Sequence, residues 1–240
     1  MLNKTEKVVL FCIPHAGGNS SSFNKWRGYM PDNIIFKPIE LSGRGKRLNE
    51  KLDASFEDMI DDVFNSIKKI MVNFDMDYYI FGHSMGAWIV LELLYYFKEY
   101  HLPYPKGVIF SGNIPPCFYH KSTPPLHLLP DKIFLEEVSK LGGIPGKIIK
   151  EKQFVEYFVP IIKNDFKLIE NYYFQQKQEK FPVKSLICSG KDDKFRVKDL
   201  VQWENYFIDK CSISLFKGGH FYIDDNIASL CNQIKDFIYM

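Results

Sequence analysis

The sequence has 240 residues, of which 46% are hydrophobic and 16% aromatic, and its formal net charge is +2. This length suits one α/β domain with a substantial apolar core, so we interpret residues 1–240 as a single domain. The near balance of 31 basic and 29 acidic residues argues against a nucleic-acid-binding protein that depends on a basic surface.

The cysteines and the apolar runs indicate a cytoplasmic protein. The five cysteines are widely spaced and include no C-x-x-C pair, so neither a disulfide framework nor a zinc site is predicted. No run approaches the roughly 20 apolar residues of a membrane span, and Val8–Ile13 is too short for a signal peptide. We therefore expect no metal and no stable association with a membrane.

Short apolar runs alternate with helical patterns along the chain, which is typical of a mainly parallel sheet flanked by helices. The predicted strands are Val8–Ile13, Ile34–Ile39, Tyr78–Phe81, Val108–Ser111, Val183–Ser189 and Ser212–Phe216. After the second strand, apolar residues recur at helical spacing from Phe56 to Ile70. Ser55 and Asp58 have the spacing of a capping box, so this helix is predicted to begin there.

The segment between the fourth and fifth predicted strands is longer than a single crossover helix requires, at about 70 residues. It opens with two Pro-Pro pairs and then shows helical patterns around Phe134–Leu141 and Phe158–Tyr173. We interpret residues 114–178 as a helical insertion that packs over one end of the sheet and forms a lid.

Residues 82–86 form a G-x-S-x-G motif between the third predicted strand and a helical run that begins at Ala87. This order is that of a nucleophile elbow, a strained turn that exposes a serine hydroxyl. Gly82 and Gly86 would keep side chains out of the close contact between strand and helix. The motif therefore predicts a serine hydrolase of α/β-hydrolase fold, with Ser84 as nucleophile.

A serine nucleophile needs a base, and the base needs an acid that orients it. His220 is the only histidine after the last predicted strand, and two glycines precede it, so we predict it as the base. The acid is expected after the fifth strand, where Asp192 and Asp193 are adjacent. The G-x-x-D spacing favours Asp193, and Asp192 is the alternative.

An oxyanion hole needs two backbone donors. One is predicted to be the N–H of Met85, which directly follows the nucleophile. The other is expected in the loop after the first strand, where we favour the Ala16 amide over that of Gly17. This loop lacks the glycine patterns of phosphate-binding loops, and we expect no cofactor.

Further motifs extend from about Val8 to Phe221. They are Pro14–Gly18 followed by Phe23 and Trp26, Leu41–Arg47, Gly82–Gly86, Leu141–Pro145, Pro160–Phe166 and Gly218–Phe221. Taken together, they resemble the stand-alone type II thioesterases that accompany nonribosomal peptide and polyketide synthases. The sequence departs from that family's pattern where Ser42 replaces a proline, and where Lys163 and Asn164 stand in place of a frequent arginine.

This resemblance implies hydrolysis of acyl or aminoacyl thioesters from the phosphopantetheine arm of a carrier protein, which removes stalled or misloaded units. Because carrier proteins are typically acidic, basic residues are candidate contacts. These are Lys121, Lys132, Lys147, Lys150 and Lys152, or Arg44, Lys46 and Arg47. We expect a monomer. The alternatives are a carboxylester hydrolase or lipase, an acyltransferase of the same fold, and a non-catalytic binding protein.

Overall fold

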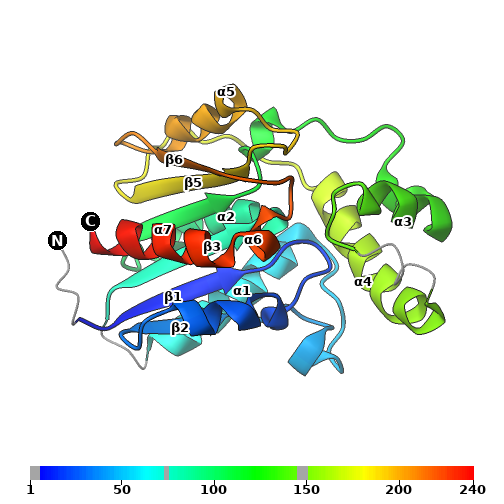
Figure 1. Ribbon diagram of the computed structural model, residues 1–240, viewed down its shortest axis with the longest axis horizontal. Coiled ribbons are helices and arrows are strands. Elements are labelled where there is room, and N and C mark those ends of the chain that lie inside the picture. Colours follow the sequence, from blue (N-terminus) through cyan, green and yellow to red (C-terminus); the bar gives the residue numbers. More distant parts are fainter. Residues whose placement is uncertain (1–5, 73–75, 145–150) are drawn as a thin grey trace.

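Strands β1 to β6 form one parallel sheet in the order β2-β1-β3-β4-β5-β6 (Figure 1). The structure is a computed structural model and describes residues 6–72, 76–144 and 151–240. The strands are Val8–Ile13, Ile34–Pro38, Tyr78–His83, Gly107–Ser111, Lys184–Gly190 and Ser212–Phe216. The sheet confirms the predicted α/β class, and the main difference is that β3 extends two residues further, to His83.

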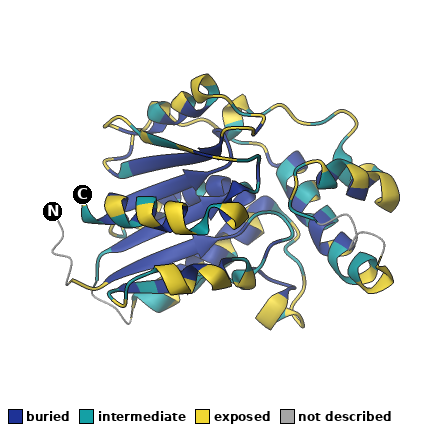
Figure 2. Ribbon diagram, viewed as in Figure 1, coloured by how far each residue is buried: buried dark blue, intermediate teal, exposed yellow. Residues whose placement is uncertain are grey.

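Helices cover both faces of the sheet because its central strands are apolar on both sides, as is usual for parallel sheets (Figure 2). One layer contains α1 (Phe56–Met71), α2 (Met85–Glu99), α5 (Val197–Leu200) and η6 (Val201–Tyr206). The other contains η1 (Ser20–Tyr29), α6 (Tyr222–Asp225) and α7 (Ile227–Tyr239). Alternate residues of β1 supply the two cores: Val9 and Phe11 face the first layer, and Val8 and Leu10 face the second.

Helix α1 begins at the predicted capping box. The Ser55 hydroxyl accepts a hydrogen bond from the Asp58 N–H at 3.0 Å, and the Asp58 carboxylate accepts one from the Ser55 N–H at 3.0 Å. Two of the N–H groups that a helix start leaves unpaired are thereby satisfied locally. The cap needs only neighbouring residues, which is why the sequence predicts it correctly.

The long segment after β4 lies beyond the carboxyl ends of the strands (Figure 1). It contains η3 (Pro116–Phe118), η4 (Leu126–Leu128), α3 (Asp131–Ser139) and α4 (Lys152–Asn171). α3 and α4 share a small apolar cluster of their own that includes Phe134 and Val159. Leu141 and Tyr173, which ended the predicted helical patterns, lie outside both helices. The role of residues 114–178 as a lid stays a prediction.

Helix α4 is attached to the rest of the protein along its second half. Pro160 lies inside the helix, and the attachments follow it in the chain. The Glu170 carboxylate accepts a hydrogen bond from the Leu126 N–H at 2.7 Å and pairs with His127 Nδ1 at 2.5 Å. The Tyr172 hydroxyl, one residue beyond the helix, donates to Glu92 on α2. The half of α4 after Pro160 is therefore tied both to η4 and to the main layer.

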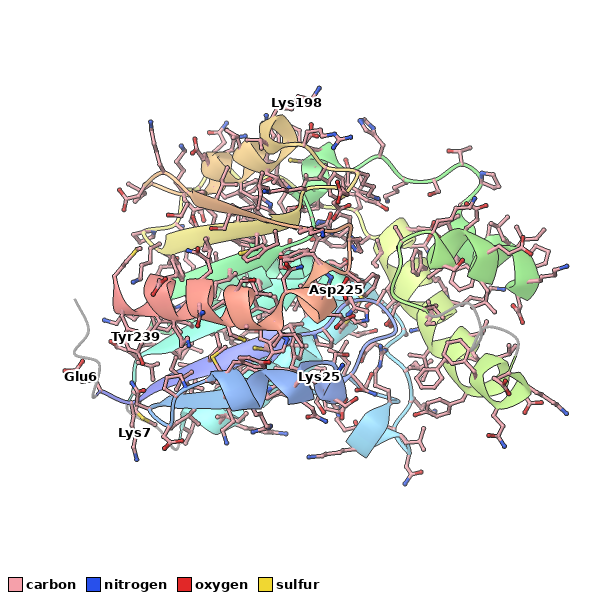
Figure 3. All side chains as sticks on the ribbon, in the orientation of Figure 1. Glu6, Lys7, Lys25, Lys198, Asp225 and Tyr239 are labelled. Carbon is pink, nitrogen blue, oxygen red and sulfur yellow. The ribbon has the colours of Figure 1, made fainter. Side chains whose placement is uncertain are left out.

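Charged side chains such as Lys25, Lys198 and Asp225 are exposed on the outer sides of the covering helices (Figure 3). In the part of the chain that the structure describes, no helix has both the length and the apolar composition that crossing a membrane would require.

Steric contact between β3 and α2 generates the first prediction. A Cβ atom at Gly82 would lie 2.1 Å from the Gly86 carbonyl oxygen, so we expect Gly82→Ala to lower the free energy of unfolding by at least about 1–3 kcal/mol. Denaturant unfolding measures this loss. Gly28→Ala is the matched control, because a Cβ atom at Gly28 meets nothing within 4 Å. Equal unfolding midpoints for the two variants would contradict the steric argument.

Candidate active site

Ser84 occupies the sharp turn between β3 and α2. Its φ of 54° and ψ of −112° are uncommon for a residue with a side chain, and they show local backbone strain. The surrounding backbone holds this conformation: the Ser84 N–H donates to the Ser111 carbonyl at 2.7 Å, and the Ser84 carbonyl accepts from the Ala87 N–H at 3.0 Å. The Asn113 side-chain amide donates to the same carbonyl at 3.1 Å. The turn has the geometry that a nucleophile elbow requires.

The structure brings Ser84, His220 and Asp193 into one chain of hydrogen bonds. His220 Nε2 lies 2.9 Å from Ser84 Oγ, and His220 Nδ1 lies 2.9 Å from Asp193 Oδ2. An ionised carboxylate can only accept, so Nδ1–H donates to Asp193 and Nε2 accepts from the Ser84 hydroxyl. The His220 and Asp193 side chains are almost fully buried, which shields the hydrogen bond between them from water, whereas the bond to Ser84 is partly buried. The arrangement can move a proton from the serine to the imidazole.

The two adjacent aspartates have different surroundings. Asp193 is buried against His220, and its second oxygen accepts a hydrogen bond from the Lys194 N–H at 2.7 Å. Asp192 is exposed, and its N–H donates to the Gly218 carbonyl at 2.9 Å. The geometry therefore favours Asp193, as the spacing predicted, although its catalytic role stays a prediction.

The two residues considered for the second oxyanion donor also differ. The Gly17 N–H donates to Asp165 Oδ2 on α4 at 2.7 Å, so this amide is already engaged. Ala16 lines the same pocket as Ser84, and no acceptor for its amide lies among the described residues. Met85, the first residue of α2, contributes an N–H at the start of a helix, where negative charge is favoured. Ala16 and Met85 therefore remain the predicted donors.

Sequence reasoning missed that His220 packs against a second imidazole, that of His83, which in turn packs against His15. The centroid of the His83 ring lies 5.2 Å from that of His220 and 5.8 Å from that of His15. His83 Nδ1 is 2.9 Å from Ser111 Oγ, which in turn is 2.6 Å from the Tyr222 hydroxyl. The proximity of the His83 and His220 rings is not evident from the sequence. That contact arises because the chain returns to this end of the sheet after β6.

Burial holds both extra imidazoles in their neutral form. Together with smaller contributions from the charges of His220 and Arg44, it lowers the pKa of His15 to about 4. Burial likewise lowers the pKa of His83 well below its ordinary value, with smaller contributions from His220 and His15. Neither ring competes for a proton near neutral pH.

An apolar pocket of about 180 Å³ opens beside Ser84 and runs between the sheet and the lid helices. Its lining residues are His15, Ala16, Gly17, Ser84, Val138, Leu141, Gly143, Ile144, Phe154, Phe158, Ile162, Phe166, His220 and Phe221. A smaller hollow of about 50 Å³ also reaches Ser84 and is bordered by Asn113, Tyr119 and Lys194. Such a site accepts an apolar group and places it against the serine.

The predicted carrier-protein contacts need one correction. Arg44 is 1% exposed and forms a buried ion pair with Asp165, so it is not available on the surface. Lys147 and Lys150 lie outside the described residues. The exposed members of the predicted set are Lys46, Lys121, Lys132 and Lys152. Within the described ranges, His, Cys, Asp and Glu form no group of three that could hold a metal ion.

Comparison with known families agrees with this geometry. The family model described as a thioesterase domain matches residues 9–238. The chain belongs to the thioesterase family. The serine, histidine and carboxylate described above accordingly lie in a serine hydrolase.

Relatives of this thioesterase are similar to it over nearly their whole length. The gramicidin S biosynthesis protein GrsT of Aneurinibacillus migulanus is 27% identical, over 98% of this chain and 91% of its own. The medium-chain S-acyl fatty acid synthase thioesterase of Rattus norvegicus is 27% identical, over 95% of this chain and 86% of its own. Among solved structures, ClbQ from the colibactin NRPS/PKS pathway superposes with a TM-score of 0.89 at 32% identity, covering 98% of each chain. The resemblance drawn from the motifs is thus confirmed.

The different environments of the two aspartates lead to a prediction. Asp193→Asn should lower kcat by on the order of 10³–10⁴-fold, because a neutral amide neither fixes the His220 tautomer nor stabilises its cation. Asp192→Asn should leave kcat close to that of the wild-type enzyme. Steady-state hydrolysis of an acyl thioester measures both, and a larger loss for Asp192→Asn would reverse the assignment.

The buried histidines predict acid sensitivity. Their pKa values are lower in the folded state than the value of about 6.5 of an unfolded chain, so the unfolded state binds protons more readily. The stability that they contribute is complete above pH 6.5 and is lost as pH falls, by about 1.4 kcal/mol per pH unit for each ring. For His15 the loss levels off below a pH of about 4.

Denaturant unfolding between pH 5 and 8 tests this expectation. His15→Phe should flatten the dependence of the unfolding free energy on pH, because it removes one of the two rings that resist protonation. His120→Gln is the control, since His120 is exposed. An unchanged slope for His15→Phe would show that His15 does not contribute.

Proposed function

We propose that this thioesterase hydrolyses acyl or aminoacyl thioesters carried on the phosphopantetheine arm of carrier proteins. In a nonribosomal peptide or polyketide pathway it would clear stalled or misloaded units, as a type II thioesterase does. The observation that carries the proposal is the hydrogen-bonded chain of Ser84, His220 and Asp193 at the mouth of an apolar pocket. The names of GrsT and ClbQ, a gramicidin S biosynthesis protein and a protein of an NRPS/PKS pathway, support the pathway class.

In the first half of the reaction, Ser84 Oγ attacks the thioester carbonyl and its proton passes to His220 Nε2. Asp193 keeps Nδ1–H in place and stabilises the imidazolium that forms. The tetrahedral oxyanion accepts hydrogen bonds from the Met85 and Ala16 amides. The intermediate collapses when the carbon–sulfur bond breaks, the pantetheine thiol leaves with the proton from His220, and an acyl-Ser84 ester remains.

In the second half, a water molecule attacks the acyl-Ser84 carbonyl while His220 takes its proton. The same two amides bind the second oxyanion. The carbon–Oγ bond then breaks, Ser84 regains its proton from His220, and the free acid departs. One chain supplies every group in this scheme, so we propose that the monomer acts without a separate cofactor.

The pocket and the surface agree with this substrate. Apolar side chains from α3 and α4 line the pocket, where an acyl chain would lie away from water. Lys132 and Lys152 are exposed on the same two helices, so they can contact an acidic carrier protein as its arm enters. The name of the rat relative supports a second candidate, the release of medium-length acyl chains from a fatty acid synthase.

A comparison of substrates tests the proposal. The enzyme is given an acyl-loaded carrier protein, the matching acyl-coenzyme A and a p-nitrophenyl ester, and kcat/KM is measured for each. We expect the highest value for the carrier-bound thioester, because only that substrate offers both the arm and the protein surface. Strong preference for the oxygen ester, with the carrier-bound thioester untouched, would instead identify a carboxylester hydrolase.

The same assay tests the nucleophile. Ser84→Ala should abolish turnover of all three substrates and the formation of an acyl-enzyme visible by mass spectrometry, because no other group occupies the position of Oγ. Ser229→Ala, on the exposed side of α7, is the control and should retain full activity. Residual turnover in Ser84→Ala close to the wild-type rate would overturn the assignment.

A further inference from the structure

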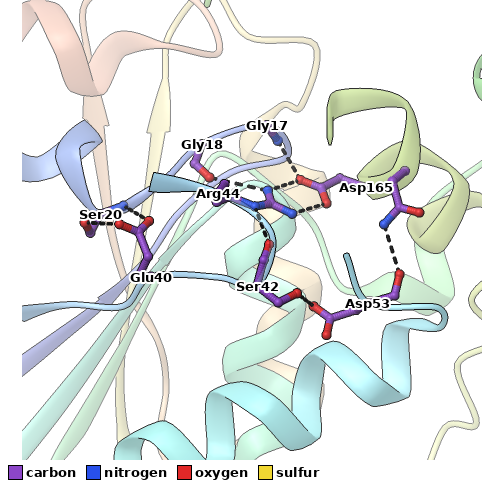
Figure 4. Close-up of polar contacts among 9 residues, drawn as sticks. Gly17, Gly18, Ser20, Glu40, Ser42, Arg44, Asp53 and Asp165 are labelled. Atoms are coloured by element: carbon purple, nitrogen blue, oxygen red, sulfur yellow. Dashed lines mark hydrogen bonds and ion pairs between the residues drawn. The ribbon is translucent and has the colours of Figure 1, made fainter. Parts of the chain in front are cut away.

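Helix α4 contacts the loop that carries the proposed oxyanion donor. Asp165 Oδ2 accepts the Gly17 N–H at 2.7 Å (Figure 4). Ile162, one turn earlier, packs against the Gly17 α-carbon. Gly17 has a φ of +78°, and a Cβ atom there would lie 2.5 Å from Ile162 Cγ1. The loop therefore contacts the helix at two adjacent atoms of Gly17. Its amide donates a hydrogen bond to Asp165, and its α-carbon lies too close to Ile162 to carry a side chain.

Asp165 is itself held by Arg44. Arg44 Nη1 donates to Asp165 Oδ2 at 2.5 Å, and Nη2 donates to Oδ1 at 2.8 Å (Figure 4). The two side chains are 2% and 0% exposed. A bidentate ion pair between a planar guanidinium and a carboxylate fixes the orientation of the carboxylate as well as its position. The oxygen that accepts the Gly17 N–H therefore cannot rotate away while Arg44 is in place.

Arg44 in turn forms hydrogen bonds with the backbone of two loops. Its Nε donates to the Ser42 carbonyl at 3.2 Å, in the loop after β2. Its Nη1 also lies 3.4 Å from the Gly18 carbonyl, one residue beyond Gly17. Three segments that are far apart in the sequence thus meet at one buried ion pair: the two loops and helix α4 (Figure 4).

We propose that Asp165, oriented by Arg44, is a positioning residue for the oxyanion hole. The Gly17 N–H is partly shielded from water and takes the Asp165 carboxylate as its acceptor, so Asp165 sets where the Gly17 amide lies and thereby fixes the loop. The adjacent Ala16 amide is then left to the substrate, which is the arrangement that the proposed function requires. Arg44 also balances the carboxylate charge, which would otherwise oppose the oxyanion a short distance away. Helix α4 and the oxyanion hole are therefore coupled.

Two double variants isolate the positioning role from the ion pair. Arg44→Met/Asp165→Asn and Arg44→Met/Asp165→Leu both remove the pair, and asparagine and leucine have similar size. Only asparagine keeps an oxygen that can accept the Gly17 N–H. Both proteins are purified, their thermal unfolding is recorded, and kcat and KM are measured on one acyl thioester with the full-length chain.

We expect the Leu variant to lose on the order of 10²-fold in kcat relative to the Asn variant, with similar KM, because a misplaced donor affects the transition state and not substrate binding. An alkyl boronic acid supplies a second readout. Its tetrahedral adduct with Ser84 mimics the oxyanion, so its affinity should fall by the same factor as kcat. Equal kcat and equal boronic acid affinity in the two variants would overturn the proposal, as would a loss confined to KM.

If Asp165 has only a structural role, the activities of the two double variants should have the opposite order. Asparagine leaves a buried amide beside the apolar methionine side chain that replaces Arg44, so the Leu variant should be at least as stable and then at least as active. If the Leu variant does not fold, Arg44→Lys is tested in its place. Lysine keeps the positive charge but cannot form the bidentate ion pair with Asp165. Positioning then predicts lower kcat and weaker boronic acid binding at constant KM. Wild-type values in folded Arg44→Lys would overturn it.

The role of Asp165 rests on the proposed function, and different results would overturn each of them. If the wild-type enzyme does not turn over thioesters and Ser84→Ala changes nothing, the proposed function fails. If the wild-type enzyme is active and depends on Ser84 while both double variants behave alike, only the role of Asp165 fails.

Discussion

At the turn between β3 and α2, Gly82 lies so close to the start of α2, and Gly86 so close to the end of β1, that neither has room for a side chain. A Cβ atom would lie 2.1 Å from the Gly86 carbonyl oxygen at the first position and 2.4 Å from the Ile13 carbonyl oxygen at the second. Between these two glycines, Ser84 has a strained conformation at the start of α2, where negative charge is favoured. The position of every other group in the site is defined relative to this turn.

The site is then assembled from loops at the carboxyl ends of the parallel strands. Asp193 follows β5 and His220 follows β6, and the hydrogen bond between them is buried. The His83 ring lies beside His220, and the His15 ring lies beside His83. Both rings are neutral near neutral pH because burial lowers their pKa values, so they add no charge beside the base and the Asp193 carboxylate is its ionic partner.

A second buried contact joins the lid helices to this framework. Removing both charges of Arg44 and Asp165 from water is unfavourable, and loss of one partner from such a pair costs about 3–5 kcal/mol. With the hydrogen bond between Tyr172 and Glu92, the pair ties the second half of α4 to the main layer, while Glu170 binds η4. Helix α3 also packs on α4, because Phe134 contacts Phe166 in the second half of α4 and shares an apolar cluster with Val159 in the first half. Pro160 separates the two halves.

The sequence by itself determined the features that depend on neighbouring residues: the six strands, the capping box at Ser55, and the elbow around Ser84. Chain order and spacing also selected His220 and Asp193, because the carboxyl ends of parallel strands converge. Only the tertiary structure decided the contacts between distant segments. His83 lies beside His220, and Arg44 is buried against Asp165, 121 positions away, and is not a surface residue. No local pattern marks such pairs, because burial and charge compensation depend on which segments the fold brings together.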